Sequence, residues 1–155
     1  MEKLTKIREL WNESSINKTA LATAYELSLF ETNYELALPD DLANYFLFLN
    51  GTDGSYDKNL FRFYSFKEFL PIKNGLANWQ GTPNYKNIVK SLPDHEKYFV
   101  FSDYSFHFSA FAIKLNKEIA DNNVYIIHGS YYEKIANTFG EFMELYLKDS
   151  PSIYV

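Results

Sequence analysis

Three histidines, with a carboxylate near one of them, are the residues of this chain that could bind a metal ion. The histidines are His95, His107 and His128. A metal site needs two or three ligands that converge at fixed geometry, and no HxxxH or HxH spacing occurs. Asp103 precedes His107 by four residues, but across a strand and a turn this spacing need not bring two side chains together. The sequence predicts no metal site.

A serine nucleophile is not indicated either. Ser102, Asp103 and His107 offer the residue types of a catalytic triad, but any chain of this length contains such a trio. The G-x-S-x-G turn that exposes a catalytic serine is absent, and so is a phosphate-binding loop with GK[ST]. The chain has no cysteine, which excludes thiolate catalysis, disulfides and Cys-based zinc sites. We predict a protein that is not an enzyme and has no cofactor. An enzyme would instead need a deep pocket with converging polar groups.

Paired carboxylates have a simpler explanation than acid–base catalysis. Asp40 and Asp41 follow Pro39, where a helix is expected to begin, and the helix dipole favours negative charge there. Asp53 and Asp57 fall in a polar loop and are expected to be solvated.

Glu31 is the carboxylate that needs a partner. It follows Leu27 by one helical turn, on a face expected to be buried, and an unpaired buried charge is very costly. We expect Glu31 to join its helix to backbone N–H groups or to a Lys, Arg or Tyr. A role in recognition is the alternative.

Composition limits the class of partner. The chain has 155 residues, is 46% hydrophobic and 19% aromatic, and carries a net charge of −5. It has no Lys/Arg cluster of the kind that nucleic-acid binding requires. No apolar run approaches the ~20 residues that span a bilayer, and the N-terminus does not resemble a secretory signal. We therefore expect a cytoplasmic protein that binds neither nucleic acid nor membrane. Its acidic balance indicates an ordinary solvated surface or, alternatively, a patch for a basic partner such as a nuclease.

Aromatic and acidic residues in three loops are the candidate contacts with a protein partner. Tyrosine beside carboxylate suits an interface with a basic protein, and loops present such groups on a rigid scaffold. The alternative is that these rings fold back and pack on the scaffold. The predicted partner-binding residues are Asp53, Tyr56, Asp57, Asp103, Tyr104, Phe106, His107, Tyr131, Tyr132 and Glu133.

These loops must be positioned by helices that precede strands. Helical periodicity appears at residues 4–11, at residues 20–31 after a Thr19 cap, and from Pro39 to Asn50-Gly51. Strands are expected at residues 60–64, 97–102, 108–115 and 123–128, and the short spacing of the last three favours an antiparallel meander. Capping boxes predict a helical turn at residues 65–68 and a final helix from Thr138 to Ser150-Pro151. Helices, then strands, then a helix indicate a single α+β domain over residues 1–155.

The order of these motifs resembles the SUKH superfamily, which includes bacterial immunity proteins and fungal cell-wall synthesis regulators. Five features carry the resemblance: Glu31 seven residues before Leu38-Pro39; LPDDL opening an aromatic helix that ends in Asn50-Gly51; FYSFKEFLPI; YFVFSDYSFHFSAFAIKL; and VYIIHG followed by IANTFGEFMELYL. The family often has a small Gly-rich turn after its FxFSD-type strand. This chain has the aromatic sequence Asp103-Tyr-Ser-Phe-His there, in a loop where partner choice would lie.

The resemblance implies a central, largely antiparallel sheet flanked by N-terminal helices and a C-terminal helix. It also implies a non-enzymatic role. Bacterial relatives indicate an immunity protein that binds and neutralises a cognate toxin in the cytosol. The fungal relatives indicate the alternative, a regulatory scaffold for protein interactions.

Overall fold

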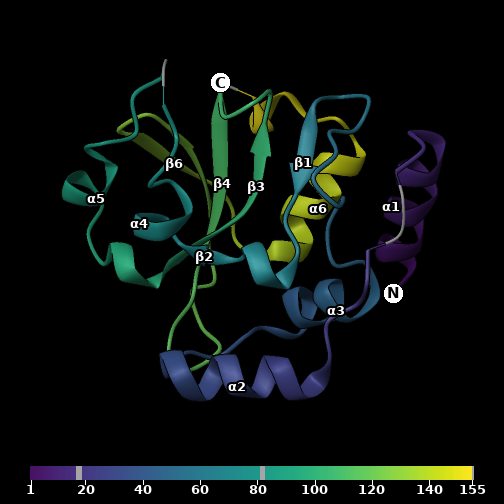
Figure 1. Ribbon diagram of the computed structural model, residues 1–155, viewed down its shortest axis with the longest axis horizontal. Coiled ribbons are helices and arrows are strands. Elements are labelled where there is room, and N and C mark those ends of the chain that lie inside the picture. Colours follow the sequence, from purple (N-terminus) through teal and green to yellow (C-terminus); the bar gives the residue numbers. More distant parts are fainter. Residues whose placement is uncertain (17–18, 81–82, 155) are drawn as a thin grey trace.

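The three aromatic and β-branched runs predicted as strands pair as a meander at the centre of an antiparallel sheet (Figure 1). The computed structural model describes residues 1–16, 19–80 and 83–154. Within these ranges the sheet has the order β1-β3-β4-β5-β6, and β2 also pairs with β3. The strands are β1 (Phe61–Phe63), β2 (Leu70–Pro71), β3 (Tyr98–Tyr104), β4 (Ser109–Lys114), β5 (Val124–His128) and β6 (Tyr131–Ala136).

Helices cover both faces of this sheet, which confirms the predicted α+β architecture (Figure 1). One hydrophobic core joins the sheet to α1, α2, α3 and α6, and a second core lies under α4 and α5. The helices are α1 (Glu2–Glu13), α2 (Ala24–Tyr34), α3 (Asp40–Phe48), α4 (Ile72–Gly75), α5 (Ile88–Ser91) and α6 (Phe139–Leu147), with the 3-10 turns η1 (Phe66–Glu68), η2 (His95–Lys97) and η3 (Pro151–Ile153).

Most of the aromatic side chains pack in the first core or against it. Phe63 is fully buried there, with its ring centroid 5.4 Å from that of Trp11 and 4.8 Å from that of Tyr146. A minority of the rings reach the surface, among them Tyr25, Phe106 and Tyr131. Because buried rings account for much of the composition, only the rings that keep some exposed surface are candidates for binding.

A β-bulge in β3 decides which face carries Asp103. Val100 pairs with Ala112, but the next pair is Ser102 with Phe111, so one residue of β3 is extra. An extra residue reverses the alternation of all later side chains. Asp103 therefore lies opposite Ala110, on the face of the second core, and beside Arg62 of β1. Without the bulge it would point into the aromatic core.

The second helix begins later than its sequence pattern predicts. Its N-cap is Thr23, whose hydroxyl accepts a hydrogen bond from Glu26 N at 3.2 Å, rather than Thr19. Residues 19–22 are held outside the helix by the end of α3, because Asn50 Nδ2 donates to Ala20 O at 2.7 Å and Ala22 N donates to Phe46 O at 3.1 Å. A tertiary contact thus overrides helix propensity here.

Several local predictions are confirmed. Asn50 and Gly51 have φ of 56° and 90° after α3, and Ser65 forms the capping box with Glu68. Thr138 caps α6 by accepting from Glu141 N at 3.0 Å. The side chain of Glu31 accepts from Leu38 N at 2.8 Å, as expected for its structural role. These features depend on residues close in sequence, which is why the pattern predicts them.

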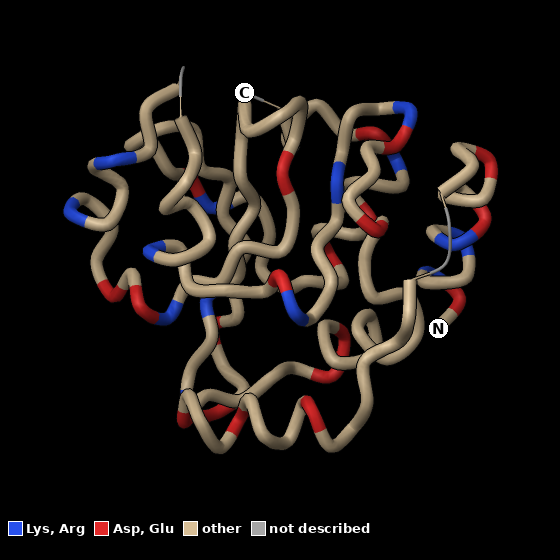
Figure 2. Tube along the Cα trace, in the orientation of Figure 1, with Lys and Arg blue, Asp and Glu red and all other residues tan. Residues whose placement is uncertain are grey.

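Charge is distributed unevenly over this scaffold (Figure 2). No Lys or Arg occurs from Thr19 to Asp57, a segment that includes α2 and α3, whereas acidic residues recur along it. Figure 2 accordingly shows acidic residues and no basic ones on both helices. In the described part of the chain, no helix has the length and apolarity needed to cross a membrane.

Candidate partner-binding end of the sheet

Three segments that are far apart in the chain meet at one end of the sheet. The β3–β4 turn follows Tyr104, which pairs with Phe61 at the start of β1 and with Ser109 at the start of β4. The β5–β6 turn lies beside them, because His128 pairs with Tyr131 and its Nδ1 lies 2.8 Å from Phe108 O. We call this region, comprising residues 52–60, 104–109 and 128–131, the sheet end. The loops predicted to bind a partner therefore converge.

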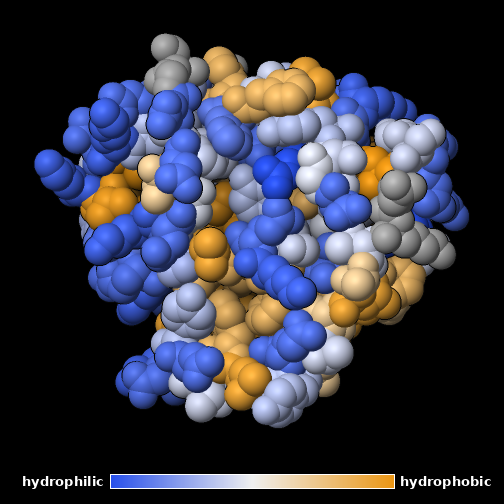
Figure 3. Space-filling view, in the orientation of Figure 1, coloured by the Kyte–Doolittle hydropathy of each residue, from blue (hydrophilic) through white to orange (hydrophobic). Residues whose placement is uncertain are grey.

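Side chains with exposed apolar surface line the sheet end (Figure 3). The centroid of Phe106 lies 4.3 Å from that of Tyr56, and the centroid of Phe108 lies 4.6 Å from that of His128. The ring centroid of Tyr104 lies 6.3 Å from that of Phe108. We define the aromatic rim by its members, which are Tyr56, Tyr104, Phe106, Phe108, His128 and Tyr131.

The turn that presents Phe106 has an unusual backbone. Ser105, Phe106 and His107 have φ of 50°, 53° and 72°, so three consecutive non-glycine residues are left-handed. Phe108 N donates to Tyr104 O at 3.0 Å and closes the turn. Each such residue costs about 1–2 kcal/mol relative to a right-handed conformation. This cost is offset by surrounding contacts, and the result is a Phe106 side chain that is 70% exposed.

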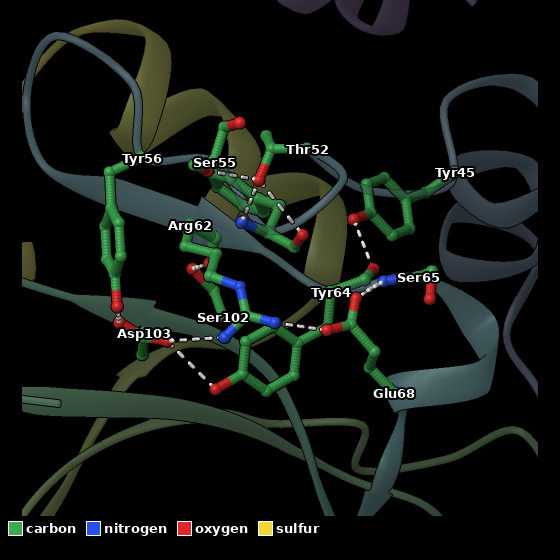
Figure 4. Close-up of polar contacts among 11 residues, drawn as sticks. Tyr45, Thr52, Ser55, Tyr56, Arg62, Tyr64, Ser65, Glu68, Ser102 and Asp103 are labelled. Carbon is green, nitrogen blue, oxygen red and sulfur yellow. Dashed lines mark hydrogen bonds and ion pairs between the residues drawn. The ribbon is translucent and has the colours of Figure 1, made fainter. Parts of the chain in front are cut away.

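A buried carboxylate supports the turn from below (Figure 4). Asp103 is 0% exposed, and its oxygens accept from Tyr56 Oη at 2.6 Å and Tyr64 Oη at 3.0 Å. Burial, together with the Asp103 charge and its hydrogen bonds, raises the pKa of both phenols well above the ordinary value. Both tyrosines are therefore neutral hydrogen-bond donors at physiological pH. They hold the residue 52–60 segment and β1 to β3.

Arg62 extends this network to the surface (Figure 4). Its Nη1 lies 3.8 Å from Asp103 Oδ2, its Nη2 bonds to Glu68, and its guanidinium lies 4.9 Å from the ring centroid of Tyr64. Glu68 also accepts from Ser65 N at 3.0 Å within the capping box. One planar cation thus joins η1 to β1 and β3, which fixes the base of the aromatic rim.

A second buried carboxylate anchors the segment before β1. Asp57 is only 4% exposed and accepts from Asn59 N at 2.8 Å, from Phe61 N at 3.0 Å and from the Tyr146 hydroxyl of α6. Tyr146 in turn accepts from Trp11 Nε1 at 2.9 Å. This chain of bonds connects α1, α6 and the loop, so Asp57 stabilises the fold of the sheet end rather than its surface.

Comparison with known proteins places these elements in a family. The family model of SMI1 / KNR4 (SUKH-1) matches residues 21–145, which include every strand and the whole sheet end. The chain belongs to the SMI1 / KNR4 family (SUKH-1). This confirms the resemblance drawn from the sequence motifs. No curated protein matches the chain.

Two of the predicted partner contacts of this SUKH-1 chain are corrected by their burial. Asp57 and Asp103 are not exposed loop carboxylates, because backbone and tyrosine donors enclose both of them. His107 is half-buried, and its ring stacks on Trp79 at 4.0 Å. The His107 ring therefore packs on the scaffold, and whether it also contacts a partner stays a prediction.

The remaining predicted residues keep surface area. Asp53 is exposed, Tyr56 and Tyr104 are half-buried, and Phe106 is exposed. Whether these side chains contact a partner stays a prediction.

The last group of predicted contacts lies in a strand rather than a loop. Tyr131, Tyr132 and Glu133 belong to β6, which the sequence pattern does not reveal because an edge strand exposes most of its residues. Tyr131 is exposed and donates to Glu133 at 2.7 Å, whereas Tyr132 is half-buried and donates to Ser91 O at 3.3 Å. Gly129, with φ of 64°, forms the hairpin turn before β6. This glycine was the sequence signal that a second strand follows β5.

Sequence reasoning missed three residues of the SUKH-1 sheet end. Leu60 is exposed and left-handed with φ of 69°, and its carbonyl accepts from Ser105 N at 2.8 Å. Phe108 and His128 complete the rim from the ends of neighbouring strands. The predicted meander was the sequence signal for Phe108 and His128. Consecutive turns of a meander lie at alternating ends of the sheet, so the β3–β4 and β5–β6 turns lie at the same end.

The described ranges contain no group of three or more His, Cys, Asp or Glu side chains placed to hold a metal ion. A cavity of about 770 Å³ lies between α1 and α6, away from the sheet end. Its Lys3 is already paired, with Glu144 at 3.7 Å and with Gly140 O at 2.9 Å. Lys3 therefore serves to join α1 to α6.

Replacing Ser105 with glycine should stabilise the SUKH-1 chain by about 0.5 kcal/mol. Glycine adopts the left-handed conformation without a penalty, which outweighs its larger unfolded-state entropy here. Ser130→Gly is the matched control, because Ser130 lies in the adjacent turn and is not left-handed, so it should lose about 0.5 kcal/mol. Urea unfolding followed by circular dichroism measures both. Equal changes in the two variants would show that the turn is unstrained.

Proposed function

We propose that this chain is an immunity protein that binds a bacterial toxin in the cytosol and neutralises it by contact, without catalysing a reaction. Membership of the SUKH-1 family supports a role as an immunity protein or a regulator. The observation that carries the proposal is the exposed Phe106 on its left-handed turn, above the buried Asp103. Strain that the rest of the fold must hold in place is typical of a functional site.

The rim has the chemistry of a protein-binding surface. A few side chains, often Trp, Tyr or Arg, provide most of the energy of protein interfaces, and Tyr and Phe are enriched there. The Tyr56–Phe106 pair is fixed before binding by the Tyr56–Asp103 hydrogen bond, so little side-chain entropy remains to be lost. A fixed aromatic pair suits occlusion of a toxin surface.

The second candidate is a regulatory scaffold that holds a resident partner through the same rim. The match to the SMI1 / KNR4 model supports it as much as the immunity role, since the SUKH superfamily that the sequence resembles includes fungal regulators as well as immunity proteins. The two candidates differ in the consequence of binding. Rescue of a poisoned cell indicates the immunity role, whereas capture of a resident enzyme without rescue indicates the scaffold.

Co-expression tests the proposal. Toxin domains taken from reading frames adjacent to this gene are expressed with the chain, and we expect the cognate domain to co-purify with it and the cells to survive. Failure of both rescue and co-purification would reject the immunity role.

Phe106→Ala should weaken binding of that domain by about 30-fold, the effect of a typical aromatic hot spot. Its melting temperature should stay near that of the unchanged chain, because the Phe106 side chain is mostly exposed. Leu70→Ser is the matched control, since Leu70 is an exposed apolar residue on β2, outside the rim. Isothermal titration calorimetry gives the affinities. Equal affinity of both variants would mean that binding occurs elsewhere.

A further inference from the structure

The outer face of α2 carries an apolar stripe with nothing packed on it. Leu27 and Phe30 bury the inner face, while Tyr25 and Leu29 are four residues apart on the opposite side and are exposed, Tyr25 by 71%; Leu21, before the helix, is exposed as well. Residues four apart in a helix lie on one face, so Tyr25 and Leu29 form a single row on α2, and Leu21 lies in the segment that precedes the helix. In Figure 3 the surface over α2 is mixed, with hydrophobic and hydrophilic side chains next to one another.

The stripe is held on a rigid support. Phe30 on the inner face lies 5.2 Å from Phe99 of β3 and 5.5 Å from Phe66. Thr23 caps the start of α2, and Glu31 joins its end to Leu38 N. The helix is therefore fixed at both ends, and the exposed row is a stable feature of the surface.

Acidic residues surround this stripe. Glu26 and Glu35 belong to α2 and its C-cap, and no Lys or Arg occurs from Thr19 to Asp57. The β4–β5 loop lies next to the end of α2, because Ala37 N donates to Asn116 O at 2.7 Å. That loop adds exposed Ile119, the exposed acids Glu118 and Asp121, and one base, Lys117. The face is apolar at its centre and acidic around it (Figure 2).

Charge complementarity decides which partner fits. A second copy of this chain would bring acidic residues against acidic residues, and an anionic lipid surface would be repelled in the same way. A straight row at four-residue spacing packs into the groove of another helix. We propose that the α2 face docks a cationic amphipathic helix of another protein. This surface lies at the opposite end of the molecule from the aromatic rim, so the inference is independent of the function proposed above (Figure 1).

The probe for this face is a labelled synthetic helix of Leu and Lys about five turns long, with Leu along one side. Its affinity for the full chain is measured by fluorescence anisotropy. We expect binding that weakens by about 10-fold between about 50 and about 200 mM NaCl, because the charges are exposed to solvent. The same helix with Glu in place of Lys should bind at least about 10-fold more weakly.

Two surface variants locate the contact. The double substitution Tyr25→Ser and Leu29→Ser should weaken binding of the Lys peptide at least about 10-fold. The pair Glu35→Lys and Glu118→Lys should reduce both the affinity and its salt dependence. Phe106→Ser is the control at the sheet end and should change nothing. Thermal unfolding confirms that all variants are folded.

Three results would overturn the inference. These are unchanged affinity in the Tyr25/Leu29 variant, equal binding of the Glu peptide, or a dimer in sedimentation equilibrium that the same variant abolishes. The last result would identify a second copy as the occupant. None of them bears on toxin binding at the aromatic rim, whose variants are tested separately.

Discussion

Replacing Asp103 with alanine is expected to destabilise the protein by about 3 kcal/mol, because a buried acceptor of several donors is removed. The hydroxyls of Tyr56 and Tyr64 lose their partner, and Arg62 loses one of its two carboxylates. This loss of stability is smaller than that for breaking a fully buried ion pair, because Arg62 retains its ion pair with Glu68 and is partly exposed to solvent. Urea unfolding monitored by circular dichroism gives the free energy.

Tyr64→Phe is the matched control for Asp103. It removes one of the donors and leaves the carboxylate, Tyr56 and Arg62 in place, so a loss of about 1 kcal/mol is expected. Asp103→Ala should also weaken partner binding at the rim, since Tyr56 no longer has a fixed position. A change of less than about 0.5 kcal/mol in Asp103→Ala would show that the network contributes no net stability.

Replacing Asp57 with alanine should cost about 3 kcal/mol as well, for a different structural reason. Two backbone N–H groups, of Asn59 and Phe61, and the buried Tyr146 hydroxyl lose the acceptor that they share. Each buried donor left without a partner costs about 1–3 kcal/mol. Because the Asn59 amide lies near the surface, where water replaces the lost bond, we expect a total near the lower end of that sum.

Asp53→Ala is the control for Asp57, since both residues belong to the same predicted binding loop but Asp53 is exposed. Its effect on stability should stay within about 0.5 kcal/mol. The two variants, compared in one thermal and urea unfolding series, separate a scaffold carboxylate from a surface one. Similar stability of Asp57→Ala and Asp53→Ala would contradict the buried network.

The sequence predicts the features that depend on neighbours in the chain. The left-handed end of α3, the Ser65–Glu68 capping box and the Glu31–Leu38 contact all join residues that are at most seven positions apart. The predicted strands are long runs of aromatic and β-branched residues that are buried on both faces, which makes them recognisable. Their order, with the capped helices, is enough to identify the family.

The edge of the sheet is harder to predict. β6 exposes most of its side chains, so its pattern resembles a loop, and the start of α2 depends on where Asn50 and Phe46 hold residues 19–22. In both places the deciding contact comes from a segment far away in sequence. Propensity and periodicity carry no information about it.

By itself, the sequence determined the α+β fold and the SUKH family. It also placed two of the three predicted contact groups in loops, whereas the third group lies in β6. The tertiary structure alone decided which side chains of those loops face solvent. One extra residue in β3 turns Asp103 toward Arg62 and Tyr64, and Asp57 is enclosed by α6 and its own turn. Phe106 is left outside on a left-handed turn. The physical reason is that the direction of a side chain in a sheet depends on register, and register is fixed by pairing with distant strands.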